Sequence, residues 1–203
     1  MKRPARIPSQ LPESLHKWLD AYALAASAAG VSLLAFAHPA EGKIIYTPAD
    51  VNISPSNKPY LLDLNHDGTA DFSLGAVTTT ASGHTQGFVF ATAKQSMNRV
   101  WDTGDRRLFA AALRPGIPVG PSGQYFRFTR GFMCTTHYGR PHGPWCHATT
   151  RYLGLSFMIE GQEHYGWARL KVISHFQEVL TGYAYETIPK KPIIAGKRHG
   201  KDC

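Results

Sequence analysis

Two segments of alternating apolar and polar residues meet at a glycine-containing turn in Tyr152-Leu-Gly-Leu-Ser-Phe-Met-Ile-Glu-Gly-Gln-Glu-His-Tyr-Gly-Trp-Ala-Arg-Leu-Lys-Val-Ile173. A period of two is the pattern of β-strands, because successive side chains of a strand point to opposite faces of a sheet. The pattern predicts strands over Tyr152–Glu160 and His164–Ile173, joined by a tight turn. A third strand is expected over Val179–Ile188 after a looser turn. Together the three strands predict an antiparallel meander.

Shorter runs of the same kind lie earlier in the chain, between clusters of Pro, Gly, Asn and Asp. They predict strands over Ile44–Tyr46, Tyr60–Asp63, Ala70–Leu74, Gly87–Thr92 and Tyr125–Phe128. One weak 3.6-residue period, over Thr103–Leu113, indicates a short helix. We therefore predict an all-β fold, an antiparallel and jelly-roll-like β-sandwich over residues 43–189 preceded by an N-terminal signal helix. A chain of 203 residues suits one such domain plus appendages.

The N-terminus indicates export. After a basic, proline-containing lead, Ala21 to Ala37 forms an uncharged run of seventeen residues, the composition of a signal segment. Cleavage is expected at Ala40-Glu-Gly42 or after Ala37, although an uncleaved signal anchor or an ordinary buried helix also fits the run. Residues 1–42 are thus predicted to be a signal peptide or signal anchor, and the protein extracellular or part of the cell envelope. Membrane contact is expected only through an uncleaved N-terminal segment.

The charge of the chain is +8 and its pI is near 9.5, which raises the question of nucleic-acid binding. The excess of Lys and Arg is concentrated in the lead and after residue 190. No recognition helix, zinc finger or RNA-binding strand motif accompanies it, so the pattern predicts no nucleic-acid partner. Residues 190–203 are predicted to be a basic disordered tail ending in Cys203, whose role is left open.

The loop Asp63-Leu-Asn-His-Asp-Gly-Thr-Ala-Asp71 places oxygen-bearing side chains at positions 1, 3, 5 and 9 around a glycine at position 6. Calcium takes six to eight oxygen ligands, and a glycine at that position permits the sharp turn of a calcium loop. The predicted ligands of a structural Ca²⁺ are Asp63, Asn65, Asp67, the carbonyl of Thr69, and Asp71. A metal-free turn is the alternative, since Asp, Asn and Gly are common in turns. An EF-hand is not expected, because position 12 is Leu74 and the flanks alternate like strands.

In this strand-loop-strand setting the DxNxDGxxD pattern resembles the loops of FG-GAP repeats, dockerins and thrombospondin type 3 repeats. The resemblance implies a structural calcium ion. It covers about a dozen residues and a single copy of the loop.

A second resemblance rests on Tyr152-Leu-Gly-Leu-Ser-Phe, His164-Tyr-Gly-Trp-Ala-Arg-Leu and Gly182-Tyr-Ala-Tyr-Glu. These strings are similar to the C-terminal half of uncharacterised exported bacterial proteins of the PEP-CTERM-associated type. The resemblance implies an envelope-associated or extracellular β-sandwich. It does not indicate any particular activity. The chain departs from that group because it lacks the Pro-Glu-Pro sorting motif and a second hydrophobic span.

Cys134 and Cys146 flank a loop rich in Gly and Pro, and export favours a disulfide between them. Zinc is the alternative, because His137, His142 and His147 lie in the same region. The spacing of these residues matches no known zinc finger.

Alternation along the last strands also suggests an aromatic surface. Tyr165 and Trp167 share one face of their strand, and Tyr183 and Tyr185 share a face of the next, so the four side chains are expected to form an outer row that stacks on glycans. A secreted hydrolase is the third reading, with Glu160, Glu163 and His164 as its clustered acid–base residues. No catalytic motif supports it. We therefore predict a non-enzymatic protein whose partners are cell-envelope components or glycans.

Overall fold

The computed structural model describes residues 42–81, 83–104, 108–121 and 129–200. The predicted signal segment, the predicted strand at Tyr125–Phe128 and Cys203 lie outside the described residues. From Gly42 onward the chain forms one compact unit. No helix that could cross a bilayer is found among the described residues.

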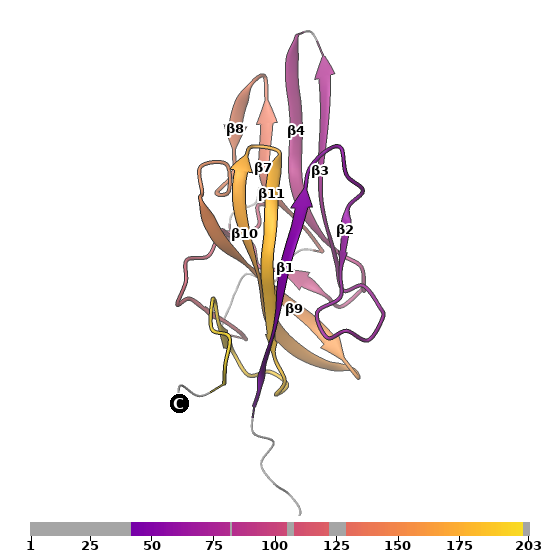
Figure 1. Ribbon diagram of the computed structural model, residues 1–203, viewed down its shortest axis with the longest axis vertical. Helices are drawn as coiled ribbons and strands as arrows, with labels where there is room; N and C mark the ends of the chain where they lie inside the picture. Colours follow the sequence, from indigo (N-terminus) through magenta and orange to yellow (C-terminus); the bar gives the residue numbers. More distant parts are fainter. Residues whose placement is uncertain (1–41, 82, 105–107, 122–128, 201–203) are drawn as a thin grey trace, which may run out of the picture. The chain divides into compact units, whose positions relative to one another are not determined.

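Two antiparallel sheets make up most of this unit (Figure 1). The first sheet has the order β1-β11-β10-β9-β5, formed by Ile44–Ile53, Gln177–Glu186, Gln162–Ser174, Thr150–Ile159 and Arg99–Val100. The second has the order β2-β3-β4-β7-β8, formed by Tyr60–Leu62, Phe72–Ala81, His84–Ala93, Arg130–His137 and Arg140–His142. A small two-stranded sheet pairs β6, Pro118–Val119, with β12, Ile193–Ile194. The described residues contain no helix, so the prediction of an all-β, antiparallel, sandwich-like fold is confirmed.

The main core lies between the two sheets. Alternate residues of the first sheet, such as Leu155 and Leu170, pack against Phe72 and Leu74 of the second, and all four are essentially inaccessible to water. Removing this apolar area from water supplies the dominant favourable free energy of folding. Trp145, from the loop after β8, is buried in the same cluster, and its Nε1 donates a hydrogen bond to the carbonyl of Ala110 at 3.0 Å.

The predicted meander is present as β9, β10 and β11. Ile159 pairs with Gln162, so a two-residue loop joins β9 to β10. Both loop residues have positive φ, 50° at Glu160 and 77° at Gly161, as in the tight turns that match the twist of paired strands. Glycine adopts this conformation without steric cost, and the turn therefore explains Gly161.

The predicted helix over Thr103–Leu113 is wrong for the residues that are described. Ala110 forms a bridge with Asp102, and Leu113 forms an antiparallel bridge with Tyr152 of β9. Leu108 has a φ of 61°, outside the helical region, and is partly exposed. Backbone hydrogen bonds to strands distant in sequence thus replace a local pattern that was only weakly helical.

The C-terminal segment differs from the disordered tail that its composition predicts. Ile193 and Ala195 are buried, and the backbone of β12 pairs with β6. The guanidinium of Arg198 lies 4.6 Å from the centre of the Tyr46 ring. The segment carries apolar residues between its lysines, and Ile193 and Ala195 among these are buried. Its high content of Lys and Arg led to the prediction of disorder.

Candidate functional site

The loop Asp63–Asp71 joins β2 to β3 as a strand-loop-strand unit (Figure 1). Its base is closed by a backbone hydrogen bond of 2.8 Å from the amide of Asp71 to the carbonyl of Leu62. Asp63 organises the turn above this base. Its carboxylate accepts the backbone amides of Asp67 at 3.3 Å and Gly68 at 2.8 Å. Gly68 has a φ of 85°, which favours glycine at the point where the chain reverses.

Asn65 and Asp67 face each other across the loop. The amide nitrogen of Asn65 donates to Asp67 Oδ2 at 2.9 Å, and the backbone amide of Thr69 donates to Asp67 Oδ1 at 2.7 Å. These hydrogen bonds lower the pKa of Asp67 below its usual value, and the bond from Asn65 has the largest effect. The other amide atom of Asn65, Oδ1, is buried and has no hydrogen-bond partner within the described part of the chain. A buried acceptor without a donor is a costly arrangement that calls for a specific reason.

Asp71 closes the loop from inside the protein and is only 4% exposed. Its Oδ2 accepts the amide of Leu64 at 2.9 Å, and its Oδ1 accepts the side chain of Asn98 at 3.2 Å. Burial raises the pKa of Asp71 to about 6, opposed by these hydrogen bonds and increased by the negative charges of Asp63 and Asp67.

Asn98 is a residue that the sequence pattern did not reveal. It is fully buried, and besides Asp71 it binds β9, because its Oδ1 accepts the backbone amide of Met158 at 3.1 Å. It follows Asp71 by 27 residues, so no local motif contains both. Its position next to the short strand β5 shows that the loop is anchored to both sheets.

His66, at the tip of the loop, makes a further connection to the first sheet. Its Nε2 lies 2.9 Å from the hydroxyl of Thr47 on β1, and its ring centre lies 5.8 Å from that of Tyr183 on β11. His66 has a φ of 60°, a conformation that non-glycine residues seldom adopt. The tertiary contacts of the side chain therefore offset a local backbone cost.

The donor set of the loop is made of carboxylate, amide and carbonyl oxygens, the ligand type of a hard cation such as Ca²⁺. Among the described residues, no three His, Cys, Asp or Glu side chains form a group that could hold a metal ion. Calcium shells also draw on amide and backbone oxygens, and here Asn65 and Thr69 are the predicted sources of these. The residues present thus fit calcium better than a transition metal.

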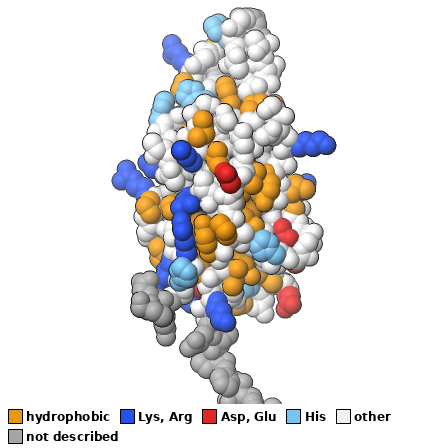
Figure 2. Space-filling view, viewed as in Figure 1, with side chains coloured by type: hydrophobic (Ala, Val, Ile, Leu, Met, Phe, Trp, Pro, Cys, Tyr) orange, Lys and Arg blue, Asp and Glu red, His pale blue; other side chains and the backbone are white. Residues whose placement is uncertain are grey.

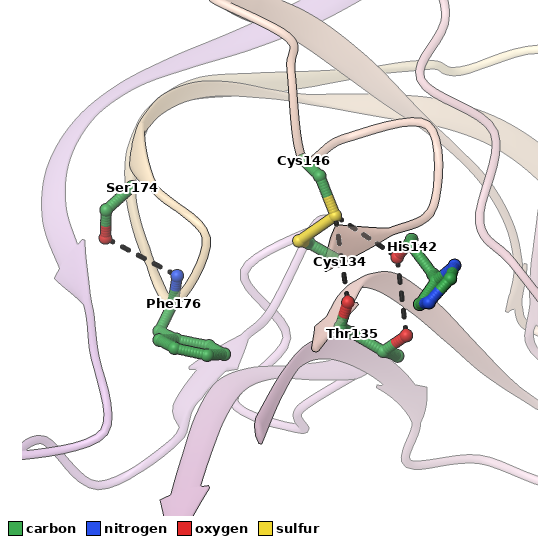
Figure 3. Close-up of a disulfide and its surroundings, with 6 residues drawn as sticks. All are labelled: Cys134, Thr135, His142, Cys146, Ser174 and Phe176. Carbon is green, nitrogen blue, oxygen red and sulfur yellow. Dashed lines mark hydrogen bonds between the residues drawn. A yellow bond between two sulfur atoms is a disulfide. The ribbon is translucent and has the colours of Figure 1, made fainter. Parts of the chain in front are cut away.

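The disulfide between Cys134 and Cys146 is present, and zinc binding by its two thiolates is therefore ruled out (Figure 3). Cys134 lies on β7, and both sulfurs are buried in the main core. Cys146 Sγ lies 3.1 Å from the carbonyl of His142 and 3.9 Å from that of Thr135. A bridged sulfur carries no hydrogen, so these are packing contacts rather than hydrogen bonds.

Reduction of this bridge is expected to lower the free energy of unfolding by about 3 kcal/mol, the chain-entropy value for a short loop. The bridge spans a sequence separation of 12 residues. Urea unfolding of the Cys134→Ala/Cys146→Ala variant, with Cys203→Ala as the matched control, measures the effect. Equal midpoints for the wild type and the double variant would show that the bridge does not constrain the unfolded chain.

The four aromatic residues predicted to form an exposed row do not do so. Trp167 pairs directly with Ala184, whereas Tyr183 pairs with Ala168, so the two aromatic side chains lie on opposite faces of the sheet. Tyr165 and Trp167 belong to a second buried cluster with Val119 and Ile193. Tyr183 is buried in the main core, and Tyr185 packs against that core. The register of pairing between β10 and β11 determines which side chains share a face of the sheet. The alternation within one strand does not specify that register.

Of the acid–base residues of the hydrolase reading, Glu160 and His164 line one hollow, whereas Glu163 is not among its lining residues. Glu163 accepts the hydroxyl of Ser156 at 2.6 Å and that of Tyr165 at 2.8 Å. The Nδ1 of His164 lies 2.9 Å from the carbonyl of Glu186. Because neighbouring residues of a strand point to opposite faces, Glu163 and His164 do not approach a common substrate position.

Charged side chains are spread over the face shown in Figure 2, where Lys and Arg are interleaved with hydrophobic and other polar residues. The described residues form one salt bridge, between Lys191 and Glu186 at 3.1 Å. The loop Asp63–Asp71, where several oxygen ligands converge, is the candidate site.

Comparison with protein-family models, curated proteins and solved structures found no match to this chain.

Proposed function

We propose that this protein is an exported, non-enzymatic β-sandwich of the cell surface or extracellular space, whose loop Asp63–Asp71 binds a structural Ca²⁺. The observation that carries the proposal is the buried Oδ1 of Asn65, which has no donor within the described part of the chain. A cation at the centre of the loop would satisfy this acceptor. The carboxylates of Asp63, Asp67 and Asp71 and the carbonyl of Thr69 would complete its oxygen shell.

Electrostatics supports the same assignment. Asp63 and Asp67 both raise the pKa of Asp71, which means that their negative charges repel the ionised carboxylate of Asp71. A divalent cation among them would turn this repulsion into attraction. Metal binding would then stabilise the folded state, because the unfolded chain does not hold the ligands together.

The position of the loop supports a structural role for the ion. Asp71 is connected through Asn98 to β9, and His66 is connected to β1. An ion that holds the loop in place would therefore also stabilise the contacts through which the loop connects the two sheets. The role proposed for the ion is accordingly structural.

The disulfide supports export, because such bonds persist mainly in oxidising compartments. The uncharged run Ala21 to Ala37 supports a signal peptide or signal anchor ahead of the sandwich.

Calcium at 100 times its Kd is expected to stabilise the oxidised full-length protein by about 2.7 kcal/mol, which raises Tm by about 5–10 °C for a chain of this size. Thermal melts in calcium and in EDTA measure this shift. Asp67→Ala is expected to abolish it. The matched control is Asp50→Ala, since Asp50 is an exposed carboxylate on β1, and this variant should retain the full shift.

An identical Tm in calcium and in EDTA would overturn the calcium assignment and reduce the loop to a metal-free turn. A shift that persists in Asp67→Ala and disappears in Asp50→Ala would place the ion elsewhere.

A further inference from the structure

A hollow of about 320 Å³ is lined by residues at the end of β9, the start of β10 and the end of β11. These strand ends lie away from the β3–β4 hairpin (Figure 1). Its polar lining residues present a carboxylate, an amide, an imidazole, a phenol and a hydroxyl, from Glu160, Gln162, His164, Tyr185 and Thr187. Ile159 and Pro189 supply apolar surface. The volume falls within the range of small-ligand pockets, about 300–1,000 Å³.

His164 is the most informative residue of this hollow. It is 4% exposed, and its Nδ1 lies 2.9 Å from the carbonyl of Glu186. A carbonyl oxygen only accepts hydrogen bonds, so Nδ1 carries the proton, and in the neutral ring Nε2 is the acceptor. The described residues provide no hydrogen bond to Nε2. Nε2 is not among the buried atoms without a partner, and His164 lines the hollow, so an oriented acceptor is accessible there to an N–H or O–H donor of a ligand.

The charge of the lining selects against anions. Glu160 is the carboxylate of the hollow, and no Lys or Arg of the described part of the chain is among its lining residues. A phosphate or carboxylate would therefore meet a like charge without a cationic partner. A neutral ligand with several hydroxyl groups fits better, because carboxylate, amide and imidazole groups all hydrogen-bond to hydroxyls.

The walls of the hollow are held by rigid structure. Glu160 lies in the tight turn between β9 and β10, and Gln162 directly follows it. The Tyr185 ring packs edge-on against Phe157 with centres 5.6 Å apart. Burial raises the pKa of Tyr185, which keeps its hydroxyl protonated and able to donate. Sites on such elements hold their geometry better than sites on long loops.

We propose that this hollow binds one neutral sugar ring. A ring hydroxyl donates to His164 Nε2, and Glu160 and Gln162 bind the neighbouring hydroxyls. The apolar face of the ring lies on Ile159 and Pro189. The site is separate from the calcium loop, so it stands whether or not the loop binds an ion.

Titration of the ¹⁵N-labelled full-length protein with methyl glycosides of glucose, galactose, mannose and N-acetylglucosamine tests the proposal. At least one glycoside is expected to saturate with a Kd of about 1–10 mM and to shift the side-chain nitrogen resonance of His164. Glucose 6-phosphate is the anionic comparator and should bind more weakly than methyl glucoside. Tighter binding of the phosphate would overturn the charge argument and the proposal with it.

Gln162→Ala and Tyr185→Phe should each weaken binding about 3-fold to 10-fold, the loss of one hydrogen bond. The matched control is Gln86→Ala, since Gln86 lines a different hollow on the second sheet and its removal should leave Kd unchanged. No saturation by any of the four glycosides at about 50 mM would overturn the proposal. So would equal weakening in Gln86→Ala.

Discussion

Replacement of Glu178 by Gln is expected to stabilise the protein by about 3 kcal/mol at pH 7. Glu178 lies on β11 between Ile53 of β1 and Val172 of β10 and is 1% exposed. Its Oε2 has no hydrogen-bond partner among the described residues. Burial raises the pKa of Glu178 from 4.5 to about 8, so at pH 7 the folded protein holds a neutral acid that the unfolded chain ionises. Each pH unit between pH 4.5 and pH 7 then lowers the free energy of unfolding by about 1.4 kcal/mol.

The pH dependence follows from the direction of this shift. A raised carboxyl pKa means that the folded state binds more protons than the unfolded state between pH 4.5 and about 8. The contribution of Glu178 is therefore fully favourable below pH 4.5 and is lost as the pH rises through 8. Gln has the same shape but does not ionise, so the Glu178→Gln variant should lack this loss, which reaches about 5 kcal/mol above pH 8.

Guanidinium unfolding of both proteins between pH 4 and pH 9 measures the difference. The matched control is Glu160→Gln, because Glu160 is exposed at the β9–β10 turn and its removal should give a curve parallel to the wild type. Parallel curves for the wild type and Glu178→Gln would show that Glu178 is ionised and solvated in the folded protein.

Replacement of Trp167 by Ala is expected to cost about 3–5 kcal/mol of stability, the range for truncating a buried Trp. The side chain is 1% exposed, and its ring centre lies 5.1 Å from that of Tyr152 and 6.0 Å from that of Tyr46. Ile193 of β12 belongs to the same buried cluster. Truncation would leave a cavity between the first sheet and the segment that covers it.

Urea unfolding at fixed pH measures this loss. The control is Tyr138→Ala, since Tyr138 is 68% exposed and its removal should change stability by less than about 0.5 kcal/mol. A loss of less than 1 kcal/mol in Trp167→Ala would contradict the burial of Trp167. It would restore the reading of Trp167 as part of an exposed aromatic surface.

The strands of the meander and the loop Asp63–Asp71 were predictable from the sequence because their signals are local. Alternation over Tyr152–Ile173 and the Glu160-Gly161 turn specify two strands and their connection within a few residues. The spacing of oxygen side chains in Asp63–Asp71 likewise concerns one loop. The cysteine pair could be proposed because a short spacing and the expectation of export suffice to suggest a bridge.

The sequence by itself therefore determined the all-β character of this protein, the meander, the disulfide and the candidate ion loop. Only the tertiary structure decided that Trp167 and Tyr183 face opposite ways, that Asn98 supports Asp71, that Ile193 covers the first sheet and that Glu178 is buried without a partner. The physical reason is range. Periodicity and spacing act between near neighbours, whereas register, burial and the partners of a polar group depend on strands that are distant in sequence and meet only in the folded chain.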